Sequence, residues 1–275
     1  VNSLSSANTA KLKSTQVAAL STAQVAALST DQVKALAVSS VAAMGSNQIN
    51  AMTTSQVGAL TAAQLKGLTT DTLAAMGTTQ VAALTTSQVA GLTVASVGSM
   101  TATQVAAMTT SQVQALTATQ VKALSAGKVA AMTTTQVAAL TNDQVKTLSD
   151  TQLKALTTSE VAALGTAQVK ALTDTQIKSL TTDAVAAMTT AQVNALSTSQ
   201  LKALSASQVT ALTSTNVAAL ATSQVSALSS SQVQALTTSA VGALSSSLVN
   251  AMTTAQVAAL TTGQVQSLST STVGG

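Results

Sequence analysis

The sequence predicts an all-α fold, a superhelical solenoid in which each eight-residue repeat forms one helix of about six residues. Three features of the 275-residue chain favour this fold. From Leu12 to Leu268, every eighth residue is Leu or Met, at 33 positions without an insertion. Five residues after each of them comes Val, Ile or Leu. Ser or Thr usually follows the Leu, and Gln stands three residues further on, so the consensus is Thr/Ser-Thr/Ser-x-Gln-Val-x-Ala-Leu.

Each repeat begins with the signals of a helix N terminus. Ser or Thr at the N-cap and Gln three residues later, at N3, form a capping box, and the Leu before the N-cap (N′) and the Val at N4 form a hydrophobic staple. In the 32 repeats from Lys13 to Leu268, the N-cap is Ser or Thr in 26, and Gln holds N3 in 23. Three more N-caps are glycines, which are acceptable there: Gly45, Gly77 and Gly165. The pattern predicts one self-capping helix per repeat.

Charged residues, which were not used to set this phase, lie where the helix dipole favours them. All seven acids fall in a predicted first turn: Asp150 and Asp174 at N1, Asp31, Asp71, Asp143 and Asp183 at N2, and Glu160 at N3. Eight of the 11 lysines fall at N5, towards the helix end: Lys34, Lys66, Lys122, Lys146, Lys154, Lys170, Lys178 and Lys202. Lys128, at N3, is the clear exception. This segregation supports the helical interpretation.

The remaining positions predict how the helices pack. N6 is Ala in most repeats and otherwise Gly, Ser or Thr, which indicates that neighbouring helices approach closely there. The variable N2 and N5 positions are expected to face solvent. The Leu, Met and Val positions are expected to line a continuous apolar core, in which the eight Met residues replace Leu.

Two other backbones were compared with this one. In one long helix, an eight-residue period would move the apolar stripe around the helix by about 80° per repeat, so the stripe could not face one partner. A β-solenoid fits less well, because Ala-Leu breaks the apolar alternation, and the 12 Gly and absence of Pro leave most repeats without turn residues. The β-solenoid remains the alternative fold.

No linker or change of composition interrupts the pattern. The sequence predicts a single continuous array over residues 1–275, with regular repeats in 13–268 and irregular ends at 1–12 and 269–275. In the first irregular end, Thr9 stands where Val is expected. A six-residue helix is too short to be stable alone, so its stability must come from stacking on its neighbours.

The composition argues against several functional classes. The chain has no His and no Cys, and its acids are spread thinly, so we expect no catalytic, cofactor-binding or metal site and no enzyme activity. It has no aromatic residue and no Arg, and its net charge of +4 is dispersed, which argues against nucleic-acid binding. No apolar run approaches the ~18 residues that span a bilayer, so no membrane insertion is expected.

One group of charges suggests a binding surface. Lys146, Lys154, Lys170 and Lys178 share the N5 position within five consecutive repeats and form a possible basic row for an acidic cell-surface polysaccharide. The simpler explanation is solubility and dipole complementarity. The Thr doublets also suggest ice binding, although the first Thr of each is needed as a cap.

The run Thr-Thr-x-Gln-Val-x-Ala-Leu, as in residues 85–92 and 253–260, resembles the repeat arrays of very large bacterial secreted or cell-surface proteins. This resemblance implies export, an extracellular or cell-surface location, and a role as a spacer, stalk or filament. We therefore expect a structural protein that associates with itself, end to end or side by side. The alternative is a surface binding or adhesion module that uses the N2 and N5 positions to hold a glycan, a protein or ice.

Overall fold

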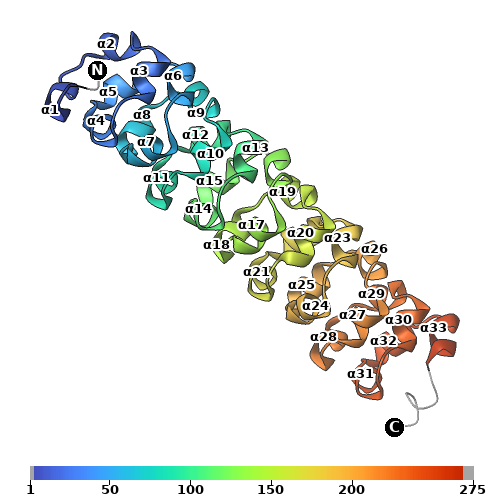
Figure 1. Ribbon diagram of the computed structural model, residues 1–275. Coiled ribbons are helices and arrows are strands. Elements are labelled where there is room, and N and C mark those ends of the chain that lie inside the picture. The colour runs from blue at the N-terminus through green and yellow to red at the C-terminus, as the bar shows by residue number, and fades with distance from the viewer. Residues whose placement is uncertain (1–2, 269–275) are drawn as a thin grey trace. The chain divides into compact units, whose positions relative to one another are not determined.

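The computed structural model describes residues 3–268 and forms two compact units, Val1–Leu140 and Thr141–Gly275. Within the described residues, every regular element is a helix of four to six residues, and there is no strand (Figure 1). The helices follow one another at the eight-residue period of the sequence and pack in a regular, repeated way. The predicted all-α solenoid is therefore confirmed, and the β-solenoid alternative is wrong.

The first unit contains the helices α1 (Ser6–Thr9), α2 (Ser14–Ala18), α3 (Thr22–Ala26), α4 (Thr30–Ala35), α5 (Val38–Ala42), α6 (Ser46–Asn50), α7 (Thr54–Ala59), α8 (Ala62–Gly67), α9 (Thr70–Ala74), α10 (Thr78–Ala82), α11 (Thr86–Gly91), α12 (Val94–Ser99), α13 (Ala102–Ala106), α14 (Thr110–Ala115), α15 (Ala118–Lys122), α16 (Ala126–Val129) and α17 (Thr134–Ala139). The second unit contains α18 (Asn142–Thr147), α19 (Asp150–Ala155), α20 (Thr158–Ala163), α21 (Thr166–Ala171), α22 (Asp174–Ser179), α23 (Thr182–Ala186), α24 (Thr190–Ala195), α25 (Thr198–Ala203), α26 (Ala206–Thr210), α27 (Ser214–Ala218), α28 (Thr222–Ala227), α29 (Ser230–Ala235), α30 (Thr238–Gly242), α31 (Ser246–Asn250), α32 (Thr254–Ala258) and α33 (Thr262–Ser267).

The capping box forms as predicted. At the start of α11, the backbone N–H of Gln88 donates to Thr85 Oγ1 over 3.2 Å, and the backbone N–H of Thr85 donates to Gln88 Oε1 over 2.7 Å. Gly45, which has no side chain to offer, still donates its N–H to Gln48 Oε1. The Gln half of the box is thus independent of the N-cap side chain.

The turn between helices needs neither Gly nor Pro. Leu92 ends α11 with φ −62° and ψ 149°, and Thr93 begins α12 with φ −72° and ψ 157°. Two extended residues therefore redirect the chain, and both conformations are open to any L-residue. No residue in the described part has a positive φ. This geometry explains how the chain turns so often with so few turn-forming residues.

Packing occurs between helices three repeats apart. In the first unit, α5 packs on α8, α8 on α11, α11 on α14 and α14 on α17. The small N6 residue lies at this contact, because a Cβ built on Gly91 of α11 would stand 3.2 Å from the Cβ of Ala62 in α8. The predicted close approach at N6 is confirmed.

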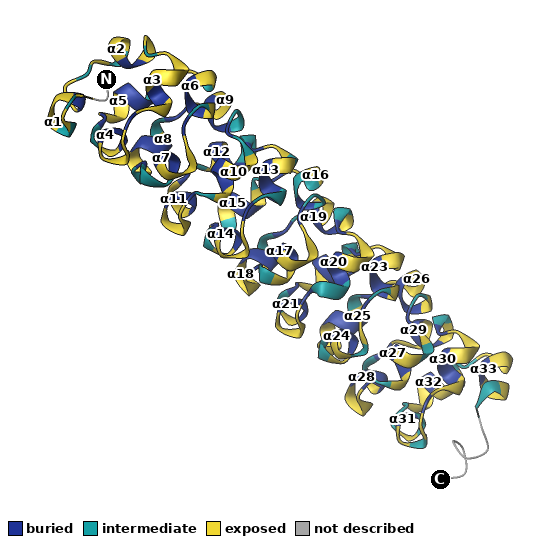
Figure 2. Cartoon of the chain, in the orientation of Figure 1, coloured by how far each residue is buried: buried dark blue, intermediate teal, exposed yellow. Residues whose placement is uncertain are grey.

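The apolar positions form the core of each unit (Figure 2). Val57 at N4 is fully buried, and Leu60 at N′ is 3% exposed. Met44 and Met100 are buried in the same way as the leucines, which confirms Met as a core residue. N2 side chains such as Ser55 are exposed, as predicted. At N5, lysines are exposed, whereas small residues range from exposed, as at Ala82, to half-buried, as at Gly58.

Removal of one cap tests the phase of the repeat. We expect Thr85→Ala to lower the free energy of unfolding by about 1 kcal/mol, because the N–H of Gln88 loses its side-chain acceptor. Thr86→Ala is the matched control, since Thr86 is exposed and lies one residue inside the helix. Urea unfolding followed by circular dichroism measures both. Equal effects of the two substitutions would contradict the assignment of Thr85 as the N-cap.

The irregular opening still follows the fold. Ser5 caps α1, and Thr9 is fully buried where other repeats place Val, with its hydroxyl donating to the carbonyl of Ser5. The other irregular end, 269–275, lies outside the described residues. Between the units, α17 ends at Ala139 and Thr141 caps α18, so the repeat phase runs on unchanged. The single continuous array stays a prediction.

Candidate functional site

The buried Gln at N3 is the repeated polar site of the structure. Gln56 in α7 is 2% exposed, and its Oε1 accepts the N–H of Thr53 over 2.7 Å. Its Nε2 donates to three carbonyl oxygens at the end of α3, those of Val25 at 2.8 Å, Ala26 at 3.2 Å and Leu28 at 2.7 Å. One amide therefore caps the start of its own helix and the end of the helix four repeats earlier.

Helix-end chemistry explains why the residue is Gln. The last four carbonyls of an α-helix have no partner within the helix, and helices of four to six residues leave most of their carbonyls in that state. The acceptor on Oε1 and the donors on Nε2 serve a helix start and a helix end at once, which neither Glu nor Lys can do. Because the Gln reaches four repeats back while helices pack three repeats apart, one superhelical turn takes between three and four repeats.

This second role of Gln was not predicted. The sequence indicated the capping box, but the partner carbonyls lie 28, 30 and 31 residues away, and no local pattern reveals them. The same three bonds recur at Gln112 in the first unit and at Gln208 in the second. The contact is therefore a property of the repeat.

Lys128 and Glu160 replace Gln at N3, and each keeps one of its two functions. Lys128 binds a helix-end carbonyl of another turn, and Glu160 caps the start of its own helix. The Nζ of Lys128, in α16, donates to the carbonyl of Gly98 in α12, the same N5 carbonyl that a Gln would bind. A lysine in the first turn of a helix is unfavourable for the helix dipole. The contact of Lys128 with another turn explains why it stands there. Glu160 accepts the N–H and the hydroxyl of Thr157, at 2.6 and 2.8 Å, and so completes the predicted capping box.

The repeats without Gln at N3 are not scattered. Eight of them, which we call the seam, follow one another at intervals of 24 or 32 residues: Ser40, Thr72, Ser96 and Lys128 in the first unit, and Glu160, Ala184, Asn216 and Ala240 in the second. These intervals are three or four repeats, the length of one superhelical turn. Leu248 is the ninth exception and breaks the series.

Contacts within each unit join seven of the eight seam repeats directly. In the first unit, α9 packs on α12, and Lys128 of α16 binds Gly98 of α12. In the second, α20 packs on α23, Asn216 of α27 donates to the carbonyl of Met188 at the end of α23, and α27 packs on α30. The seam therefore lies along one side of a unit. Its N5 residues are all Ala or Gly, so all eight N5 lysines lie outside it.

A longer side chain on the seam is expected to stabilise the fold. The Nδ2 of Asn216 reaches only the carbonyl of Met188, at 3.0 Å. Asn216→Gln adds the methylene that lets the amide reach the carbonyls of Val185 and Ala186 as well, and we expect a gain of about 1 kcal/mol in unfolding free energy. Asn250→Gln, an exchange at N5, is the control. A loss of stability in the Asn216 variant would show that the turns lie too close on the seam to accept Gln.

The four lysines of the predicted basic row are all exposed. Lys146 and Lys170 lie on the packed helices α18 and α21, and Lys154 and Lys178 on the packed helices α19 and α22. The Nε2 of Gln176 in α22 binds the backbone carbonyl of Lys146, which joins the two pairs. The sequence did not assign Lys202 to this group, although α25 packs on α22.

These lysines do not form a purely positive surface. Residues 141–203 contain five Lys and also five acids: Asp143, Asp150, Glu160, Asp174 and Asp183. The acids lie at helix starts and the lysines near helix ends, and α18, α19 and α22 each carry one of both. Beyond Asp183, the sequence has no acid at all.

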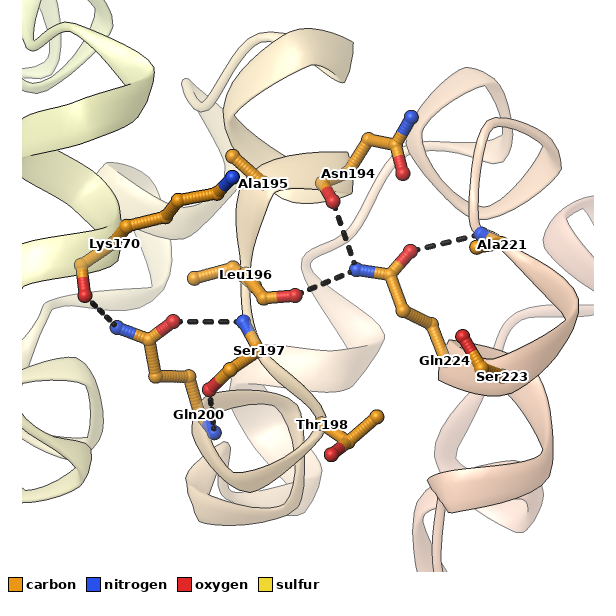
Figure 3. A pocket seen from close by; sticks show the side chains of 10 residues that line it. All are labelled: Lys170, Asn194, Ala195, Leu196, Ser197, Thr198, Gln200, Ala221, Ser223 and Gln224. Atoms are coloured by element: carbon orange, nitrogen blue, oxygen red, sulfur yellow. Dashed lines mark hydrogen bonds between the residues drawn. The ribbon is translucent and has the colours of Figure 1, made fainter.

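A groove opens at the edge of this region, around Lys170 (Figure 3). It has a volume of about 480 Å³ and is bounded by α21, α24 and the starts of α25 and α28. Side chains of Asn194, Thr198 and Ser223 line it together with Lys170. Ala221 is the N-cap of α28, where most repeats have Ser or Thr, and it also lines the groove.

Two other features bear on function. Across residues 3–268, no three side chains of His, Cys, Asp or Glu come together in a group that could hold a metal ion. In the same part of the chain, none of the helices has the length and apolar character needed to cross a membrane.

The sequence was compared with known proteins. The family model described as the ALTTAQ repeat matches nine segments of the chain, residues 1–38, 30–62, 40–70, 62–94, 118–150, 150–182, 175–198, 185–222 and 240–270. No curated protein matches the chain.

Proposed function

Because the chain belongs to the ALTTAQ repeat family, we propose that it is a structural array, a spacer or filament component, located outside the cell or on a bacterial cell surface. A repeat family and a solenoid of short helices suggest a structural role. The observation that carries the proposal is the Gln contact, which makes each turn bind the next through the same bonds. In such an array the number of repeats, rather than one specialised site, sets the length.

A change of array length tests the spacer role. Duplication of residues 53–108 adds seven repeats, about two superhelical turns, and keeps the Gln and seam positions in register. We expect the largest dimension measured by small-angle X-ray scattering to grow in proportion to the number of repeats, with the mean-residue helical signal unchanged. An unchanged largest dimension, or loss of helical signal, would overturn the spacer role.

Self-association is proposed from the last described helices. Val257 in α32 and Val265 in α33 are 48% and 53% exposed, although the same N4 position is fully buried in α7. A second copy that packs its own helices on these valines would bury them.

Sedimentation velocity over a range of concentrations, with electron microscopy, measures this association. We expect filaments or concentration-dependent oligomers, and monomers after Val257→Lys with Val265→Lys. Val94→Lys is the control, since Val94 is 47% exposed at N1 of α12, in the first unit. A wild-type chain that stays monomeric at millimolar concentration would overturn self-association but not the spacer role.

The proposed location rests on the resemblance to large bacterial surface proteins. Protease treatment of intact source cells tests it, with a cytosolic protein as the internal control. Selective loss of this chain is the expected result, and protection equal to that of the cytosolic protein would overturn the proposed location.

The alternative function, a surface binding module, rests on the exposed lysines and on the groove beside Lys170. It needs a place where particular side chains converge, and the groove is such a place.

A further inference from the structure

We propose that the groove beside Lys170 binds a carbohydrate that carries a carboxylate, such as a uronic acid unit of a polysaccharide. This inference deepens the alternative function, the surface binding module, and rests on it. The four helices around the groove contact one another in pairs: α21 packs on α24, and α25 packs on α28. The groove therefore lies between two pairs of packed helices.

Hydrogen bonds fix the walls of the groove. The Nε2 of Gln200, in α25, donates to the backbone carbonyl of Lys170, in α21. The Nε2 of Gln224, in α28, donates to the carbonyls of Asn194 at 3.1 Å and Leu196 at 2.8 Å. Both Gln side chains are buried, so the backbone beneath the groove is held in place before any ligand arrives (Figure 3).

Four polar side chains at the groove have no partner within the described chain: Lys170, Asn194, Thr198 and Ser223. Together they offer an ammonium group, an amide with both donors and an acceptor, and two hydroxyls. Sugar hydroxyls need donors and acceptors side by side, and a carboxylate pairs with the ammonium group. Ala195 and Ala221 add small apolar surfaces, against which a sugar ring can place its C–H face.

The local charge selects an anionic ligand over a neutral one. Lys170 is the only charged residue that lines the groove. None of the four surrounding helices, α21, α24, α25 and α28, contains an acid, and neither does the rest of the chain after Asp183. A carboxylate would thus meet a cation without a competing negative charge from these helices.

Ala221 provides a direct structural test. In most repeats the N-cap side chain is Ser or Thr, and its oxygen accepts the N–H of the N3 residue. Ala221 leaves that space empty, and the N-cap of α28 has no side-chain hydrogen bond. Ala221→Thr restores the consensus and fills part of the groove, so it is expected to retain or raise stability while it removes the binding space.

The experiment is an NMR titration of the intact chain with a tetrasaccharide of alternating glucuronate and N-acetylglucosamine. We expect saturable shifts confined to residues 166–171, 194–200 and 221–224, with a Kd on the order of a millimolar, as suits a shallow, exposed site. The uncharged N-acetylglucosamine tetramer should bind at least about tenfold more weakly. Inorganic phosphate should give no saturable shifts at the same concentration.

Variants separate this site from general charge attraction. Lys170→Gln is expected to weaken binding about tenfold, and Ala221→Thr to abolish it without lowering the Tm. Lys178→Gln, at the same N5 position but outside the groove, should leave the Kd unchanged. Three results would overturn the proposal. They are equal losses of binding in the Lys170 and Lys178 variants, undiminished binding by the Ala221→Thr variant, and the absence of saturable binding by the native chain. None of these results alters the scaling of length with repeats, so failure of the site and failure of the spacer role are distinguishable.

Discussion

Gln56→Glu is expected to lower the free energy of unfolding of the first unit by about 3–5 kcal/mol, because it buries a charge that has no opposite charge beside it. The carboxylate would keep the capping-box acceptor but lose both Nε2 donors. It would then face the carbonyl oxygens of Val25, Ala26 and Leu28, which are 2.7–3.2 Å from Nε2 in the native chain. Urea unfolding of the full chain, followed by circular dichroism, measures the loss.

Gln16→Glu is the matched control for this substitution. Gln16 forms the same capping-box bond, from the N–H of Lys13, but it is exposed, and the structure gives its Nε2 no acceptor. We expect a change within about 0.5 kcal/mol, as for most surface substitutions. Acidification should restore part of the stability lost in the Gln56 variant, because the protonated carboxyl regains one donor. Equal losses at Gln16 and Gln56 would mean that the contact between turns contributes nothing.

Leu201→Ala is expected to lower the free energy of unfolding of the second unit by about 2–5 kcal/mol, the range for a buried Leu replaced by Ala. Leu201 holds the N4 position of α25 and is fully buried. Its core is built by neighbouring turns, so a cavity there weakens several helices that are too short to be stable alone. Thermal unfolding and urea unfolding both report this loss.

Val265→Ala provides the comparison at the same position of the repeat. Val265 holds N4 of α33 and is 53% exposed, so we expect a loss below about 0.5 kcal/mol. The contrast separates burial from the helix propensity of the N4 residue. If the two substitutions cost the same, the core would not lie where the structure places it.

Local chemistry allowed much of the fold to be predicted from sequence. The N-cap, N3 and N4 residues lie within one helical turn, so the start of each helix can be predicted from its own repeat. Thr85 and Gln88 form the predicted capping box. The small N6 position predicted close approach, which Gly91 and Ala62 confirm. The number of repeats per turn could not be predicted, because it depends on how helices three and four repeats apart fit together.

The hydrogen bonds between turns could not be predicted from the pattern within one repeat. The spacing of the repeats without Gln at N3 nevertheless reflects them. The seam residues recur at 24 or 32 residues because one side of the superhelix returns once per turn. Ala184 and Asn216 are two of these departures from Gln, and they lie on one side of the second unit. Lys128 was interpreted through the helix dipole alone, whereas its partner, Gly98, lies 30 residues away.

The groove shows a similar limit. Lys170 was one of four equivalent lysines in the sequence, and Ala221 was one of the few N-caps other than Ser, Thr or Gly. Only the packing of α21, α24, α25 and α28 places these two residues in one groove. A site built from separate turns cannot be assigned until the superhelical period is known.

Each buried Gln is inferred to join its own turn of the superhelix to the preceding one. NMR scalar couplings across hydrogen bonds measure this contact, together with hydrogen exchange of the Gln side-chain amides. We predict a coupling from the Nε2 of Gln56 to the carbonyl carbon of Leu28, and slow exchange of the Gln56 side-chain amide relative to those of Gln16 and Gln24. A Gln56 side-chain amide that exchanges as fast as that of Gln16, with no coupling to Leu28, would contradict the claim.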